Sequence, residues 1–395
     1  MTQGVARRVL TGVAGWAVVL VGLRLTLAAP ERCRVPTGTE VRRAAEEAVG
    51  WFARNLREDG RWLYAYDRAA DRVDPTYNIV RHAGVSLSLA QADRHGIAGA
   101  RETLDAGLAY ALGHLVDTGA GVGFGVEGRD LEAGAAALLA SALVERREVT
   151  GETVHDGTLR ALGRFLAAQV EDDGRVLGWW SPSSGGPVPE STSQYYTGEA
   201  FWALARLHTT FPREGWDDPV RRVARYLARE RDDREPRFPP VSDHWAAYAY
   251  DEIAHWPEGG GLGPGDREYA RRQAGLFSVQ ARWEAQKDGA VTRLTHGADV
   301  LAAGVGTWGE GLGALWRASA ADPGLADLRA GAAGRLVCLS GLLVDRQVGA
   351  TEAAAGARPD ATRGAWFSGG RTQMDDQQHA LSALLAATAV LEEGG

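Results

Sequence analysis

The chain has 395 residues, 45% of them hydrophobic and 24% charged, which is typical of a globular protein with a sizeable core. Its 43 basic residues are outnumbered by 51 acidic ones, and the net charge of −8 argues against a nucleic-acid partner, since such proteins carry a basic surface. A single lysine, Lys287, and two cysteines, Cys33 and Cys338, exclude Schiff-base chemistry at any other lysine, a cysteine-rich metal site and a disulfide framework. We expect Cys338 to be a buried small hydrophobe and assign no role to Cys33.

The N-terminus carries the pattern of a secretory signal or a signal-anchor. Arg7 and Arg8 precede a mostly apolar run over residues 9–29, in which Arg24 is the only charge, and both kinds of segment begin in this way. We expect residues 1–36 to form an uncleaved anchor with a short linker, a cleaved signal peptide being the alternative. Since flanking arginines stay in the cytoplasm, we predict a single-pass cell-membrane protein with an extracytoplasmic catalytic domain, or a secreted protein if the leader is cleaved.

From residue 37 onward the chain alternates between two kinds of helical segment, and almost no strand pattern occurs. Thr37 and Glu40 form a capping box at the first helix start. Helices with a polar stripe lie at a surface, whereas helices that are apolar nearly all round are buried. The polar-striped, arginine-rich segments span 38–57, 100–117, 156–170, 219–231, 266–287 and 323–345, and the apolar segments span 78–94, 131–148, 195–209, 243–255, 307–320 and 377–392.

Outer helix, turn and inner helix thus repeat six times, which predicts an all-α protein, an (α/α)6 toroid of six helical hairpins. A two-domain bundle is the alternative, but no long polar linker occurs after residue 37. We therefore expect one toroid domain over residues 37–395. The turns before several inner helices combine glycine with aromatic residues, as in Asp59-Gly60-Arg61-Trp62, Gly123-Phe124-Gly125, Asp173-Gly174-Arg175 and Ala365-Trp366-Phe367.

These turns and the six hairpins resemble the α/α toroid superfamily of six-hairpin glycosidases, uronate epimerases, terpenoid cyclases and lanthionine cyclases, over about residues 38–392. The resemblance is one of architecture, and a fold alone does not give a function. The zinc-dependent members hold their metal with cysteine and histidine, which Cys338 alone cannot do. Met374-Asp375-Asp376-Gln377 lacks the first aspartate of the acid motif of protonating terpene cyclases. A polar, histidine-rich cavity suits a sugar better than a terpene.

In such a toroid the N-termini of the inner helices meet at one mouth of the central cavity, and polar residues gather at these positions. Carboxylates there are candidates for the acid and base of glycoside hydrolysis. Tyrosine, arginine and histidine at the start of one helix suit the removal of a proton beside a carboxylate. The catalytic candidates are Tyr77, Arg81, His82, Glu199, Asp243, Asp375 and Asp376.

Other residues at the same mouth are candidates for holding a sugar. Tryptophans near the turns can stack on sugar rings, arginines can clamp a carboxylate, and histidines enter the mouth from four different hairpins. We expect His82, Glu199, Asp243 and Asp376 to share one cavity, and repulsion between Asp375 and Asp376 to raise the pKa of one of them. The substrate-binding candidates are Asn78, Trp180, Tyr195, Tyr196, His244, Trp245, Tyr248, Arg293, His296, Trp366, Gln377 and His379.

Several candidates also have a purely structural explanation. Asn78, Asp243 and Asp375 stand where helix N-caps belong. Thr307 and Glu310 match a capping box, so we expect Glu310 to be structural. No His-x-x-x-His or His-x-His spacing occurs, and metal ligands would have to converge from separate hairpins. We expect no metal and no cofactor.

These observations favour a membrane-anchored or secreted carbohydrate-active enzyme that hydrolyses a cell-envelope or extracellular glycan. A uronate lyase or epimerase on the same scaffold is one alternative, and a non-catalytic glycan-binding or scaffold toroid is another. The expected partners are a glycan and, through residues 9–29, the membrane. Nucleic acid is not expected as a partner, and the sequence indicates no protein partner.

Overall fold

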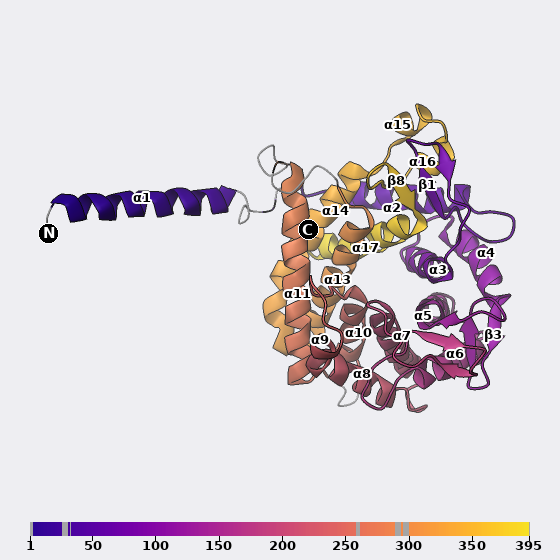
Figure 1. The fold of residues 1–395 in the computed structure, drawn as a ribbon. Coiled ribbons are helices and arrows are strands. Elements are labelled where there is room, and N and C mark those ends of the chain that lie inside the picture. Colours follow the sequence, from indigo (N-terminus) through magenta and orange to yellow (C-terminus); the bar gives the residue numbers. More distant parts are fainter. Residues whose placement is uncertain are drawn as a thin grey trace.

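The computed structural model describes residues 3–25, 31, 33–257, 261–288, 294 and 300–394. Within this part of the chain one helix, α1 (Gln3–Leu25), is long and apolar enough to cross a membrane, over Arg7–Leu25. That stretch is not buried against the protein, and Figure 1 shows α1 extending away from the remaining helices.

Six inner helices form a closed ring. Each one contacts the next in chain order, and the last, α17, packs back against the first, α3 (Figure 1). This arrangement confirms the predicted α/α toroid. The inner helices are α3 (Ile79–Arg94), α5 (Ala133–Thr150), α7 (Tyr196–Thr210), α10 (His244–Ala254), α13 (Ala303–Ala321) and α17 (Met374–Gly394).

A second layer of helices covers the ring from outside, and one outer helix precedes each inner helix along the chain. The predicted capping box of Thr37 and Glu40 starts the first of them. The outer helices are α2 (Gly38–Arg54), α4 (Ala100–Leu112), α6 (Asp156–Ala168), α8 (Asp217–Arg229), α11 (Pro264–Ala285) and α14 (Arg329–Arg346). Short helical turns also occur in the described part of the chain: α9 (Arg231–Arg234), η1 (Gln286–Asp288), η2 (Pro323–Leu328), α15 (Ala350–Ala354) and α16 (Pro359–Thr362).

Short antiparallel strands occur in the turns, where the sequence showed almost no strand pattern. With two or three residues each, they are too short for an alternating pattern to be visible. In one sheet Tyr66 pairs with Val73 and Thr372, which joins the first hairpin to the last. The sheets are β2 (Arg72–Val73), β1 (Ala65–Asp67) and β8 (Arg371–Gln373); β3 (Leu115–Asp117) and β4 (Val122–Phe124); and β5 (Leu131–Glu132), β6 (Trp179–Ser181) and β7 (Gly186–Pro187).

Small residues let the inner helices approach closely. Gly306 of α13 lies so near α17 that a Cβ there would stand 2.4 Å from the carbonyl carbon of His379. Large side chains fill the space between the layers instead, among them Trp51, Trp62 and Trp366, which are fully buried. Trp366 donates its indole N–H to the carbonyl oxygen of Leu343 at 2.8 Å. Its predicted role in substrate binding is therefore wrong, since it belongs to the core.

A disulfide between Cys33 and Cys338 joins the segment that follows α1 to the outer helix α14. Cys338 is buried, as expected, but it is bonded to Cys33 and is not simply a small hydrophobic side chain, and the sequence had given Cys33 no role. Two ion pairs flank the bond, one between Glu31 Oε1 and Arg335 Nε at 3.1 Å and one between Arg34 and Asp345 at 2.7 Å. The linker is thus fastened along α14 by one covalent and two electrostatic links.

Candidate active site

A cavity of about 400 Å³ opens at the mouth where the inner helices begin. All six inner helices or the residues just before them contribute to its wall, as the sequence predicted for the toroid mouth. Its lining includes the aromatic side chains of Tyr195, Tyr196, Trp245 and Trp308. The polar side chains in its wall are those of Asn78, Arg81, Glu199, Ser242, His244, Thr307, Asp375, Gln378 and His379.

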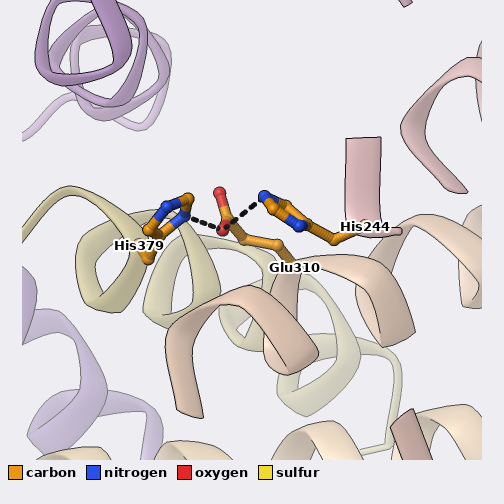
Figure 2. Close-up of side chains that lie close together, drawn as sticks. All are labelled: His244, Glu310 and His379. Carbon is orange, nitrogen blue, oxygen red and sulfur yellow. Dashed lines mark hydrogen bonds and ion pairs between the residues drawn. The ribbon is translucent and has the colours of Figure 1, made fainter. Parts of the chain in front are cut away.

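Two histidines of this wall, His244 and His379, converge on Glu310, a buried residue of a neighbouring helix that does not itself line the cavity. His379 Nδ1 lies 2.6 Å from Glu310 Oε2, and His244 Nε2 lies 3.9 Å from the same oxygen (Figure 2). The two imidazole rings are 5.1 Å apart between centroids and almost perpendicular. Because α13, which carries Glu310, packs against both α10 and α17, the histidines lie on the same side of the ring.

The surroundings drive the two histidines to opposite protonation states. Burial lowers the pKa of His244 well below its ordinary value, and the nearby His379 lowers it further. For His379 the opposing carboxylate of Glu310 outweighs burial and raises the pKa to about 9, with help from Asp375 and Asp376. At neutral pH one cavity wall therefore holds a neutral imidazole beside a protonated one. Titratable groups whose environments separate their pKa values in this way are suited to act as base and acid.

Glu310 is the centre of this group, which the sequence interpretation missed. Its predicted capping box with Thr307 does not form, because α13 begins at Ala303 and Thr307 lies in its second turn. Instead Glu310 is 1% exposed and accepts hydrogen bonds from His379 and, at 3.4 Å, from Tyr248 Oη. A carboxylate within a mostly apolar helical segment was the available signal, since such a group is costly to bury without partners.

Arg81 and Asp375 stand beside the histidines and balance each other's charge. Arg81 Nε lies 3.6 Å from Asp375 Oδ2, and Asp375 Oδ1 lies 3.7 Å from His379 Nε2. Arg81 Nη1 also donates to Tyr64 Oη at 2.5 Å and to Gln373 Oε1 at 2.7 Å. Tyr64, Gln373 and Asp375 therefore fix the position of Arg81, and its positive charge is already paired within the protein.

Glu199 also lines the cavity and is buried without a hydrogen-bond partner for its Oε2 atom in the described part of the chain. Burial raises its pKa well above the ordinary value, and the negative charge of Asp243 adds to the effect, so the site favours the protonated form of this side chain. The space it occupies depends on Gly134, where a Cβ would lie 2.1 Å from Oε2. Its neighbour Tyr196 donates to Glu132 Oε1 at 2.8 Å.

Three predicted site residues at the helix starts hold backbone or buried groups and do not line the cavity. Asp243 caps α10 by accepting from the Ala246 N–H at 2.9 Å and pairs with the buried Arg231 at 2.5 Å. Asp376 accepts backbone N–H groups of Ala303 and Gln373 at 3.0 and 2.8 Å. Gln377 donates to Thr372 Oγ1 at 2.6 Å. The expectation that Asp243 and Asp376 share the cavity with Glu199 is therefore wrong.

The pKa of one aspartate is nevertheless raised as expected. Burial raises the pKa of Asp376 to about 7, and the negative charge of Asp375 adds to the effect. The Asp376 side chain joins α13 to α17, because it accepts from the N–H groups of Ala303, at the start of α13, and Gln373, just before α17. Its protonation therefore affects a contact between helices.

Tyr77 and His82 lie outside the cavity, between α3 and α4. His82 Nδ1 is 2.6 Å from Tyr77 Oη, and His82 Nε2 is 3.0 Å from the carbonyl oxygen of Gly107. Both ring nitrogens are thus engaged in contacts. Burial lowers the pKa of His82 to about 4, so the ring is neutral at pH 7. Their predicted catalytic role and the placing of His82 in the cavity are corrected by this geometry.

The remaining candidates divide in the same way. Asn78, Tyr195, Tyr196, His244, Trp245 and His379 line the cavity. Trp180 is buried in strand β6 and pairs with Leu131. Tyr248 lies one helical turn after His244, and its ring stacks on Trp202 with 4.4 Å between the ring centroids. Its hydroxyl group donates to Glu310, and the side chain does not line the cavity. Arg293 and His296 lie outside the described residues.

His244, Glu310 and His379 also have the composition of a metal site. Their ligand atoms all lie within 4.8 Å of one another, the one such group among the described residues. Two histidines and a carboxylate suit several divalent transition metals. A metal would, however, have to displace the hydrogen bond between His379 and Glu310 and the proton that Glu310 stabilises on His379. Among the described residues His379 and Glu310 thus bond to each other, whereas the buried His244 Nε2 has no hydrogen-bond partner.

Comparisons with known proteins place the fold. The chain is similar to a D-mannose isomerase at 14% identity and a TM-score of 0.60, covering 90% of this chain and 97% of that one. A cellobiose 2-epimerase from Spirochaeta thermophila matches at 14% identity and a TM-score of 0.58, covering 87% and 93%. An unsaturated glucuronyl hydrolase specific for heparin matches at 12% identity and a TM-score of 0.59, covering 90% and 98%. No protein-family model and no curated protein sequence matches.

These matches confirm the resemblance to the six-hairpin α/α toroids at the level of the fold. By their names the three proteins catalyse different reactions, so the fold does not select among them. The choice depends on the residues of the cavity.

Proposed function

We propose that this chain is a carbohydrate isomerase, an enzyme that moves a proton between the carbonyl carbon of an open-chain sugar and its neighbour. The observation that carries the proposal is the pair of histidines with opposite pKa shifts in one cavity wall, held by Glu310. The similar structures, which include an isomerase, an epimerase and a hydrolase, support an enzyme that acts on carbohydrates.

The two histidines complete such a reaction without a further reactant. Neutral His244 takes the proton from C2 while protonated His379 gives a proton to the carbonyl oxygen, so that the C–H electrons form the C=C bond of an enediol. His379 then takes the proton from the C2 hydroxyl, and His244 returns its proton to C1. An aldose has become a ketose, and both histidines have regained their starting states. Return of the proton to the opposite face of C2 would give the epimer.

The charges of the cavity favour a neutral sugar. Arg81 is paired with Asp375, and burial raises the pKa of Glu199, which favours its uncharged form. A uronate would bring a further negative charge into a wall that is already balanced. We therefore expect hexoses, and saccharides ending in a hexose, to be better substrates than uronates.

The second candidate function is glycoside hydrolysis, which the sequence analysis favoured because of its carboxylate residues. Its specific support is Glu199, a buried acid with an unpaired oxygen in the cavity wall, opposite which Asp375 would serve as base. Incubation of the full-length protein in detergent with mannose, glucose, cellobiose and mannobiose separates the two functions. Isomerisation converts each sugar into an isomer of the same mass, whereas hydrolysis splits the disaccharides and leaves the monosaccharides unchanged. An unchanged panel would favour a non-catalytic toroid.

The pH dependence of kcat/KM follows from the same two pKa shifts. We expect activity to fall as pH rises through about 9, because His379 loses the proton that it must donate. Activity should also fall in acid, at a pH below the ordinary histidine range, because His244 becomes protonated and can no longer act as a base. A pH–rate profile between pH 4 and 11 tests this. A single ionisation near pH 4 to 5 with no alkaline limb would instead point to a carboxylate base.

We also infer that the toroid lies outside the cytoplasm, attached by residues 1–36 with α1 as its membrane anchor. The exposed apolar helix supports attachment, and the Cys33–Cys338 disulfide supports an oxidising compartment, since such bonds are rare in the cytoplasm. Alkaline extraction of membranes tests the attachment, because an integral helix stays in the pellet whereas a cleaved, secreted protein is released.

A further inference from the structure

A second pocket of about 340 Å³ adjoins the cavity. Tyr195 and Ser242 line both spaces, so the two lie side by side. The pocket is formed by residues 237–242, which lie between α9 and α10. Gln280 of α11 and Gln194, which lies just before α7, also line it. None of its lining residues takes part in the proton transfer proposed above.

The pocket combines aromatic surface with polar groups. Phe238 is 98% exposed and Tyr195 is 46% exposed, which is unusual for large aromatic side chains in a protein that buries most of its others. The polar groups include Gln280, whose Oε1 atom is shielded from solvent and has no hydrogen-bond partner in the described part of the chain. Arg237 donates to Gln194 Oε1 at 3.3 Å. Apolar faces with a few polar groups suit a ligand that has both kinds of surface.

We propose that this pocket is a subsite for the second residue of an oligosaccharide whose reducing-end residue lies in the cavity. A pyranose ring presents C–H groups on its faces and hydroxyl groups around its edge. The faces match Phe238 and Tyr195, and the hydroxyl groups match the polar side chains of Gln194 and Arg237 in the lining. The proposal rests on the proposed isomerase function, to which it adds the substrate class.

The chemistry of isomerisation explains why one such pocket beside the cavity is sufficient. Only the reducing-end residue of an oligosaccharide opens to a free carbonyl group, so only that residue has to lie in the cavity against His244 and His379. The rest of the chain has to leave the cavity in one direction. The second pocket shares Tyr195 and Ser242 with the cavity wall, so it lies where the next residue of the chain would be.

Binding of reduced sugars tests the subsite independently of turnover. Glucitol and cellobiitol have no carbonyl group and cannot react, so calorimetry on the full-length protein measures binding alone. We expect cellobiitol to bind about tenfold more tightly than glucitol, as one well-packed aromatic contact allows. In Phe238→Ala this advantage should be lost, while the affinity for glucitol stays within twofold. In the control Val154→Ala, which removes a side chain that is 74% exposed and lies in the turn before α6, the advantage should remain.

The possible outcomes separate the subsite from the proposed function. Equal affinity for the two alditols, no binding of either at millimolar concentration, or an advantage that survives in Phe238→Ala would overturn the subsite. Cellobiitol binding that depends on Phe238 without any turnover of cellobiose or glucose would support the subsite and contradict the isomerase. Turnover of glucose without tighter binding of cellobiitol than of glucitol would support the isomerase and contradict the subsite.

Discussion

Replacing His379 by glutamine is expected to lower kcat/KM for sugar isomerisation by about 10²–10⁴-fold, the usual contribution of a positioned acid or base. Glutamine keeps a hydrogen bond toward Glu310 but cannot donate a proton to a carbonyl oxygen at neutral pH. His244→Gln should cause a loss of similar size, because it removes the base. Steady-state kinetics on the disaccharide and monosaccharide substrates measure both effects.

The matched control for these variants is His255→Gln. This histidine ends the same helix as His244, its side chain is 56% exposed, and it lies at the far end of α10 from the cavity. It should leave kcat/KM within twofold of the unchanged protein. Full activity in His244→Gln or His379→Gln, with unchanged melting temperature, would remove both histidines from the mechanism. Loss of activity on treatment with a chelator, restored by zinc or manganese, would assign the group of three to a metal.

Breaking the Cys33–Cys338 disulfide is expected to lower the free energy of unfolding by roughly 2–5 kcal/mol. The bond joins residues 305 positions apart, so it removes much of the freedom of the unfolded chain and ties the start of the toroid to its last outer helix. Urea unfolding of the Cys33→Ser/Cys338→Ser variant, compared with the unchanged protein under oxidising conditions, measures the effect.

A reductant should reproduce the loss in the unchanged protein and have no effect on the double variant. Since the disulfide lies on the outer helix α14, kcat/KM at low temperature should be the same in both proteins. Equal midpoints of unfolding with and without reductant would show that the two ion pairs of the linker hold it in place without the covalent bond.

The fold could be predicted from the sequence because its signals are local and repeated. Arginine-rich, polar-striped segments became outer helices, and segments rich in alanine and glycine became the inner ring. Disulfide pairing has no such signal, since nothing near Cys33 indicates a partner 305 residues away. The strands were missed for a different reason, because two or three residues cannot show a period.

The cavity lies at the helix starts that the sequence indicated, but only some of the predicted side chains line it. Successive residues on a helix point about 100° apart, so neighbours in the sequence face different surroundings. Arg81 lines the cavity, whereas His82, the next residue, faces α4. Likewise Asp375 and His379, four positions apart on one face, line the cavity, whereas Asp376 faces the start of α13. Without the rotation of each helix, the sequence could not distinguish these neighbours.

Glu310 shows a further limit of local patterns. The spacing of Thr307 and Glu310 fits a capping box, but α13 starts earlier, at Ala303, and so Glu310 faces the ring interior in place of capping the helix. The partners that define its role, His244 and His379, come from two other hairpins. Convergence of this kind depends on ring closure and becomes visible only in three dimensions.

Solvent isotope incorporation tests the central claim, that the two histidines move a proton at the carbon beside a sugar's carbonyl group. The full-length protein is incubated with glucose, mannose and cellobiose in heavy water, and the recovered sugars are examined by mass spectrometry and NMR. The account predicts one deuterium in uncut sugar, at C1 of the ketose or C2 of the aldose, and none with His244→Gln. Shortened chains that have gained a water, with no carbon-bound deuterium, would contradict it and favour hydrolysis through Glu199 and Asp375.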